Sequence, residues 1–261
     1  ATGYITTAER KPSWESLKVQ LPDETPKPPD EKLVPGAMVF IGAKHVAHPG
    51  DWPRWWAFIP GANWRHPQGP KSNIKNKQDY PVVQVSYEDA QAYARWAGKR
   101  LPTEAEWEFA ARGGLRQANY AWGDEFHPQK KRMANTFAGK QFPIVDPNYK
   151  AMISASKVAS YPPNGYGLYD MAGNVWQWVA DWYRADAFKL ESIHANNINP
   201  QGPENSFDPY DQFAPPYAPR RVIRGGSFLC DENFCMSYRP SARRGVDPSN
   251  PMEHIGFRLV L

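Results

Sequence analysis

The sequence predicts an α+β domain that is rich in loops and poor in regular secondary structure. Its 261 residues are enough for one large domain with a substantial core. Aromatic residues make up 14% of the chain and include 11 Trp, whereas the mean hydropathy is only −0.69, so the apolar material lies in rings rather than in aliphatic runs. The 27 Pro and 19 Gly residues limit the length of helices and strands. Trp and Tyr nevertheless occur throughout the chain, so the composition does not indicate disorder.

Two short helices are predicted from their N-terminal capping signals. In each case a Ser or Thr is followed three residues later by an acidic residue, which is the spacing of a capping box. In the first helix, alanines then recur on one face, as in an amphipathic helix. The predicted helices and their capping residues are 87–97 (Ser86 and Asp89) and 104–111 (Thr103 and Glu106).

The rest of the chain is predicted as strands and loops. Strands are expected in the later part of 166–183, at 222–224 and at 254–261. Residues 1–36 are polar and Pro-rich, which indicates an extended arm that belongs to the same domain as residues 37–261. The remaining loop predictions are a packed, Trp-rich segment at 37–70 and a long polar surface loop at 184–219.

Charge and cysteine content exclude several classes of protein. The net charge is +4 and the Lys and Arg residues occur in short, scattered runs, so we expect no nucleic-acid partner. No stretch is long and apolar enough to predict a transmembrane helix. Two Cys residues exclude a disulfide-rich scaffold and leave the compartment open, with a bacterial cytoplasm and a periplasm equally compatible.

Five motifs occur in one order along the chain. They are Gly98–Glu108 (GKRLPTEAEWE), Tyr120–Gly123 (YAWG), Asn164–Trp178 (NGYGLYDMAGNVWQW), Arg224–Ser227 (RGGS) and Gly256–Arg258 (GFR). Together they resemble the formylglycine-generating enzyme, or sulfatase-modifying factor, family of the C-type-lectin-like superfamily. The resemblance implies the irregular α+β fold of that family, with 37–261 as its catalytic domain. Ala1–Tyr4 resembles an internal family segment, so we expect the family's opening segment to be absent from this chain.

Cys230 and Cys235 follow the RGGS motif and have four residues between them. Taken alone, such a pair is typical of a small disulfide loop or of two buried thiols. The family resemblance implies instead that the two thiolates hold Cu(I), a metal that favours soft ligands, and that the substrate's thiolate is the third ligand. Because the pair can also oxidise when metal is absent, the two interpretations are compatible.

The resemblance assigns Ser227 and Trp176 to the pocket for oxygen and the substrate thiol. Without it, Ser227 would be interpreted as a turn residue and Trp176 as a core residue. Two positions depart from the family pattern, since Phe234 stands where Tyr is common and His254 where Asn is common. These departures favour an alternative in which a superfamily oxidase acts on another substrate, such as a siderophore precursor.

Calcium is the second metal that the resemblance implies. One site would use the side chains of Asp170 and Gln177 and the carbonyl groups of Gly173 and Val175, with Gln177 replacing the usual Glu. Calcium prefers several hard oxygen ligands, so losing this charge should lower its affinity. A second, weaker assignment uses Asn135 and Thr136, but residues 148–150 replace the expected acidic segment and Lys150 would oppose a cation.

The function that the resemblance implies is a copper-dependent oxidase that uses O2 to convert a peptidyl cysteine of a sulfatase to formylglycine. Cys230, Cys235, Ser227 and Trp176 would form its active site. A third interpretation is a non-enzymatic structural or binding subunit that keeps the same fold. Family motifs alone do not decide between these interpretations, because one fold can host different activities.

Overall fold

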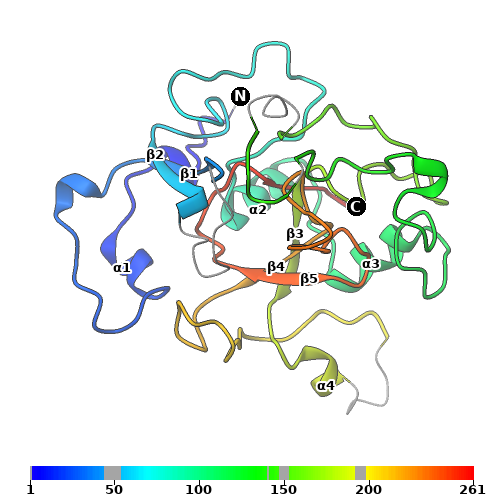
Figure 1. Cartoon of the computed structure of the whole chain (residues 1–261). Helices are drawn as coiled ribbons and strands as arrows, with labels where there is room; N and C mark the ends of the chain where they lie inside the picture. Colours follow the sequence, from blue (N-terminus) through cyan, green and yellow to red (C-terminus); the bar gives the residue numbers. More distant parts are fainter. Residues whose placement is uncertain (1, 44–53, 140, 147–152, 192–197) are drawn as a thin grey trace.

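A four-stranded sheet lies at the centre of the molecule (Figure 1). The structure, a computed structural model, describes residues 2–43, 54–139, 141–146, 153–191 and 198–261. The strand order is β5-β4-β3-β6, in which β6 runs parallel to β3 and the other neighbours are antiparallel. The bounds are β3 Trp176–Trp182, β4 Arg221–Arg224, β5 Arg243–Val246 and β6 Ile255–Phe257.

This sheet confirms the strands expected in 166–183 and at 222–224. The strand expected over 254–261 is shorter than predicted, because only Ile255–Phe257 pair with β3. β5 was not predicted from the sequence. It contains two Arg and a Gly and has no apolar alternation, so its strand character comes from pairing with β4.

The interpretation of 37–70 as a packed loop is wrong in part, because two strands form there. β1 Gly36–Phe40 pairs antiparallel with β2 Trp56–Pro60, with Met38 opposite Phe58. The paired residues lie about twenty positions apart, so no tight-turn signal marks the hairpin in the sequence. In Figure 1 this small sheet lies beside the central one.

Both predicted helices are confirmed, and both capping boxes form. α2 spans Tyr87–Trp96, and Ser86 accepts the N–H of Asp89 while Asp89 accepts the N–H of Ser86. α3 spans Glu104–Arg112 with the same reciprocal bonds between Thr103 and Glu106. Each box satisfies backbone donors that the first helical turn leaves without an intrahelical partner.

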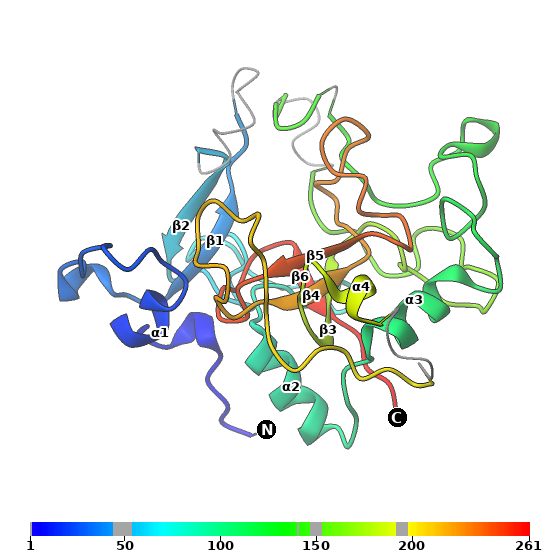
Figure 2. The same cartoon turned by 90° about the horizontal axis from the view of Figure 1, so that it is seen from below.

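α3 is attached to the central sheet through Trp107. This ring is almost fully buried and lies in one apolar cluster with Val179 of β3 and Val222 of β4. Figure 2 shows α2 and α3 on one side of the sheet, whereas the orange segment between β4 and β5 rises on the other side. The helices therefore support the sheet from the side opposite to the cysteine-bearing segment.

Two further α-helices and three 3₁₀ turns complete the regular structure of the described residues. α4 Ala187–Glu191 lies within the predicted surface loop 184–219 and corrects that prediction in part. Near the N-terminus, the Tyr4 hydroxyl donates to Asp89, which attaches the first residues to α2. The other elements are α1 Trp14–Lys18 and the 3₁₀ turns Thr7–Glu9, Asp30–Lys32 and Pro128–Lys130. Among the residues described here, no helix has the length and apolarity needed to cross a bilayer.

Candidate active site

Cys230 and Cys235 lie side by side in a tight turn after β4. Their Cα atoms are 4.7 Å apart and their sulfur atoms are joined as a disulfide. Both side chains are buried, at 1% and 7% exposure. The turn is closed by Asp231, whose carbonyl accepts the N–H of Cys235 and whose carboxylate accepts the N–H of Asn233.

The RGGS motif brings the backbone close enough to build this turn. Gly225 and Gly226 have φ of 91° and 69°, a region that other residues adopt with difficulty. A Cβ at Gly226 would lie 2.8 Å from the backbone nitrogen of Tyr238, so only glycine fits there. Ser227 follows, fully buried, with its N–H directed at the Cys230 sulfur at 3.5 Å and its hydroxyl accepting the N–H of Leu229 at 3.2 Å.

Trp176 starts β3 and belongs to the same buried cluster as both cysteines. Its backbone N–H donates to the carbonyl of His254 at 2.8 Å, which links β3 to the residue before β6. The fold thus brings together the four residues that the family resemblance assigned to catalysis: Cys230, Cys235, Ser227 and Trp176.

An aromatic group that the sequence did not reveal covers the outer part of the cysteine turn. Phe234 stacks on Phe142 with ring centres 4.4 Å apart and meets Trp55 edge-on at 5.3 Å. Phe234 is nevertheless 45% exposed, so it lies between this cluster and solvent. The three residues are far apart in the sequence, and only their aromatic character could have suggested the contact.

His254 is buried beside the site and is uncharged at neutral pH. Its ring packs on Trp56 at 4.8 Å, and among the described residues no group hydrogen-bonds to its Nδ1. Burial, with a contribution from Arg244, lowers the pKa of His254 to about 3. The neutral ring can accept or donate a hydrogen bond but brings no charge to the site.

Glu253 is a buried acid next to His254. One of its carboxyl oxygens accepts the N–H of Phe40 at 2.7 Å, and burial raises its pKa to about 8. The folded state therefore holds this carboxyl protonated at pH values where an unfolded chain would release the proton. Glu253 also lines a cavity of about 190 Å³ with Phe228, which directly follows Ser227.

We expect the stability of the chain to fall as the pH rises toward 8, because of Glu253. Its pKa is raised on folding, so its contribution is complete below the ordinary glutamate value of 4.5 and is lost as the pH passes through about 8. Glu253→Gln keeps an acceptor for Phe40 but cannot ionise. Thermal melts across this range should show a smaller decline of Tm for Glu253→Gln than for the parent, whereas the exposed control Glu24→Gln should behave as the parent. Identical slopes for all three proteins would contradict the assignment.

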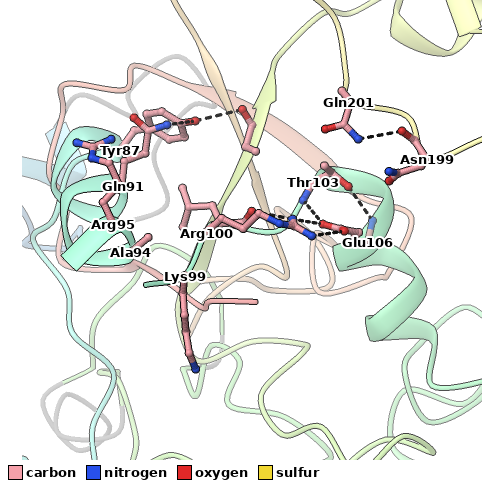
Figure 3. Close-up of a pocket in the computed structure, with 12 residues that line it drawn as sticks. Tyr87, Gln91, Ala94, Arg95, Lys99, Arg100, Thr103, Glu106, Asn199 and Gln201 are labelled. Carbon is pink, nitrogen blue, oxygen red and sulfur yellow. Dashed lines mark hydrogen bonds and ion pairs between the residues drawn. The ribbon is translucent and has the colours of Figure 1, made fainter. Parts of the chain in front are cut away.

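A larger pocket of about 340 Å³ lies between α2 and the start of α3 (Figure 3). Its lining includes Arg95 and Lys99, and also Arg100 and Glu106, which form an ion pair with each other. Its lining contains none of the four residues assigned to catalysis. Because α2 and α3 lie on the side of the sheet opposite to the cysteine-bearing segment (Figure 2), we do not assign the chemistry to this pocket.

The cysteine pair offers a donor set that fits Cu(I). In reduced form its two sulfurs would supply soft thiolates within an apolar cluster, and the Ser227 N–H already points at one of them. Elsewhere in the described part of the chain, no group of three or more His, Cys, Asp or Glu side chains could hold a metal ion. Metal binding would require reduction of the disulfide, since copper binds thiolates.

Two of the oxygen atoms that the resemblance assigned to calcium accept hydrogen bonds from protein donors. The Gln177 side-chain oxygen accepts bonds from Trp107 and Arg258, and the Thr136 carbonyl accepts one from Arg132. Asn135 uses its amide nitrogen as a donor to the carbonyl of Ser154. Residues 148–150, which bear on the second site, lie outside the described part. In this arrangement the Gln177 oxygen and the Thr136 carbonyl would have to release protein donors before they could bind an ion.

Comparison with known proteins identifies the family. The model of the sulfatase-modifying factor enzyme 1-like domain matches residues 3–261. The chain is 43% identical over 260 residues to the formylglycine-generating enzyme of Thermomonospora curvata, covering 100% of this chain and 75% of that protein. It is 45% identical over 260 residues to the formylglycine-generating enzyme of Streptomyces coelicolor, and this match covers 100% of this chain and 72% of that protein. PvdO from Pseudomonas aeruginosa is similar in structure, with 27% identity, a TM-score of 0.48 and coverage of 75% and 64%. The chain therefore belongs to the formylglycine-generating enzyme, or sulfatase-modifying factor, family.

Proposed function

We propose that this chain oxidises a cysteine of a sulfatase polypeptide to formylglycine, with Cu(I) held by Cys230 and Cys235 and O2 as the oxidant. Family membership supports an oxidoreductase that acts on a sulfatase. The observation that carries the copper proposal is the pair of buried, adjacent sulfurs, one of which faces the N–H of Ser227. When bound, Cu(I) supplies the redox centre at which O2 is reduced.

The chain's own residues would prepare the site for a thiolate substrate. The N–H of Ser227 would stabilise negative charge on Cys230, because a hydrogen bond to the charged form favours that form. Trp176 and the rest of the buried cluster keep the sulfurs in an apolar environment that excludes water. His254 is neutral there, so it does not compete as a cation for the substrate thiolate.

The overall reaction balances only with an external reductant. The substrate side chain loses one hydrogen from carbon and one from sulfur, with two electrons, to give a thioaldehyde. Water then replaces the sulfur and releases hydrogen sulfide, leaving the aldehyde. Reduction of O2 to water takes four electrons, so two molecules of an external thiol supply the other two and leave as a disulfide.

We propose that the cavity beside Phe228 binds the substrate residues that flank the reacting cysteine. The cavity is lined by Phe228, which directly follows Ser227 in the chain, and by side chains from the 64–83 and 154–155 segments. Its lining contains none of the four residues assigned to catalysis, so it would hold parts of an extended peptide that are remote from the reacting sulfur. Binding of remote parts of a substrate can position the reacting group.

Incubation with a sulfatase peptide tests the proposal. The reduced chain is supplied with Cu(I), air, a small thiol and a peptide that contains one cysteine, and the peptide is analysed by mass spectrometry. We expect loss of the thiol, formation of an aldehyde and release of sulfide, with no reaction of a matched peptide in which serine replaces cysteine. An unchanged cysteine peptide in the presence of copper-loaded protein would contradict the proposal.

A second candidate is oxidation of another substrate by the same copper pair. The observation that favours it is the changed surroundings, since Phe234 provides a ring without a hydroxyl and His254 packs on Trp56. Retention of copper without reaction of the peptide would favour this candidate. Failure to bind copper at all would favour a structural role for the disulfide.

A further inference from the structure

Glu253 presents a carboxyl oxygen to the cavity beside Phe228 that the rest of the protein does not use. Its first oxygen accepts the N–H of Phe40 at 2.7 Å. The second oxygen has no hydrogen-bond or ion-pair partner among the described residues, and protein atoms do not enclose it fully. The residue is only 8% exposed and lines the cavity. The second oxygen is therefore directed into the cavity.

The cavity has the composition of a binding pocket. Its volume is about 190 Å³, and Glu253 is the one acidic side chain in its lining. Much of the remaining wall is apolar and includes Trp64, Ile74, Val83 and Phe228. Binding pockets typically combine apolar walls with a few polar groups that fix the orientation of the ligand. Glu253 is placed to be such a group.

Among the described residues, no positive charge acts on the carboxyl of Glu253. The titratable side chains that face this region are Lys77 and Tyr80, which line the cavity, and His254, which is next in the chain. The ammonium of Lys77 lies over the Tyr80 ring, 5.6 Å from its centre, and His254 is uncharged at neutral pH. A carboxyl in apolar surroundings without a cation favours its neutral form, which agrees with the raised pKa of Glu253.

A protonated carboxyl in this position is a hydrogen-bond donor. The first oxygen is occupied as the acceptor for Phe40, so the proton is carried by the second oxygen, which faces the cavity. An acceptor that enters the cavity would satisfy this buried donor, and that favours its binding. Along an extended polypeptide, the acceptors that recur at every residue are the main-chain carbonyls.

We propose that Glu253 binds a main-chain carbonyl of the substrate polypeptide in the cavity beside Phe228, through the carboxyl oxygen that Phe40 leaves free. This inference rests on the proposed function, because it takes the polypeptide that reaches Cys230 as the occupant of the cavity. The contact would fix the position of the polypeptide along the cavity relative to the active site. Glu253 is then a substrate-binding residue that takes no part in the oxidation.

A cationic side chain of the polypeptide is the alternative occupant, and it predicts the opposite pH dependence. A cation binds the ionised carboxylate, so its affinity would rise as Glu253 loses its proton. A carbonyl binds the protonated carboxyl, so its affinity would fall over the same pH range. The carbonyl is favoured because nothing in the described lining stabilises the carboxylate.

The affinity of a serine peptide between pH 6.5 and pH 9 tests the contact without catalytic turnover. The peptide has serine in place of the reacting cysteine, an acetylated N-terminus and no His or Lys, so it does not titrate in this range. Binding is followed by fluorescence anisotropy with a dye that does not titrate either. We expect the affinity for the parent to fall about tenfold at pH 9, because a group with a pKa of about 8 is then about nine-tenths ionised.

Two variants accompany this measurement. Glu253→Gln keeps an acceptor for Phe40 and an N–H donor for the carbonyl, so its affinity should be high and constant with pH. Glu24→Gln, at an exposed position outside the cavity, is the matched control and should follow the parent.

A series of modified peptides identifies the carbonyl. Each main-chain amide near the serine is replaced in turn by an alkene, which keeps the shape but removes the acceptor. One replacement should weaken binding to the parent about tenfold at pH 6.5 and have little effect on binding to Glu253→Met, which lacks the donor. If Glu253→Met does not fold, the pH comparison of the parent with Glu253→Gln decides the question alone.

Several results would overturn the inference. An affinity that rises with pH would show that a cation occupies the cavity. The same pH dependence in the parent and in Glu253→Gln, or no binding at any pH, would show that Glu253 does not hold the peptide. If the cysteine peptide is nevertheless converted to the aldehyde, the proposed function stands without this contact. Binding with the expected pH dependence but no aldehyde would contradict the proposed function alone.

Discussion

Replacing Cys230 or Cys235 with serine is expected to abolish formation of the aldehyde. Each variant leaves one thiolate, which cannot hold Cu(I) between two soft ligands. Loss of a residue that only supports metal ligands typically costs roughly 10–100-fold, so we expect the loss of a ligand to exceed 100-fold. The measurement is the initial rate of aldehyde formation with reduced protein, copper and a cysteine peptide.

Two comparisons separate catalysis from folding in this experiment. Glu232→Gln lies in the same turn at an exposed position and should keep the parent rate. Melting is compared under reducing conditions, in which the parent also lacks the disulfide, so the serine variants should match its Tm closely. A serine variant that keeps the parent rate would show that the pair is structural.

Arg224→Met is expected to cause the largest loss of stability. Arg224 is fully buried and its guanidinium forms ion pairs at 2.5 Å with both Glu104 and Glu108, and also donates to the Pro240 carbonyl. Breaking a buried pair typically costs about 3–5 kcal/mol, and we expect about 3 kcal/mol here because Glu104 keeps its pair with Arg243 and Glu108 keeps its pair with Arg112. For a chain of this length that corresponds to a fall in Tm of about 10 °C.

Arg112→Met is the matched control for this network. Arg112 also pairs with Glu108, but its side chain and that of Glu108 are each about a quarter exposed, so the loss should be about 1 kcal/mol or less. Arg224→Lys should not restore stability, because an ammonium cannot donate to both carboxylates in the fork geometry of arginine. Equal Tm values for Arg224→Met and Arg112→Met would contradict the importance of burial.

The parts of the fold that the sequence predicted correctly depend on local signals. α2 and α3 start at capping boxes whose partners are three residues apart, so Ser86 and Thr103 mark them without tertiary information. β1, β2 and β5 depend on partners elsewhere in the chain. Arg243–Val246 becomes a strand because β4 lies next to it, and no sequence pattern marks that neighbour.

The residues of the candidate site also fall into two groups, those that local sequence identifies and those that only the fold brings together. Cys230, Cys235 and Ser227 are close in the sequence and follow a motif, so their grouping could be predicted. The contact of Phe234 with Phe142 and Trp55 could not, because it joins distant segments. The calcium assignment depended on residue types at family positions, and it did not anticipate that Arg258 would use the oxygen of Gln177.

The binding of Cu(I) by the cysteine pair can be measured by an anaerobic competition titration of the reduced chain. We expect one Cu(I) per chain, bound by Cys230 and Cys235, with an affinity that rises when a cysteine peptide is added and stays the same with the serine peptide. A reduced chain that retains no copper, or one that retains as much after Cys230→Ser as before, would show that the pair is not a copper site.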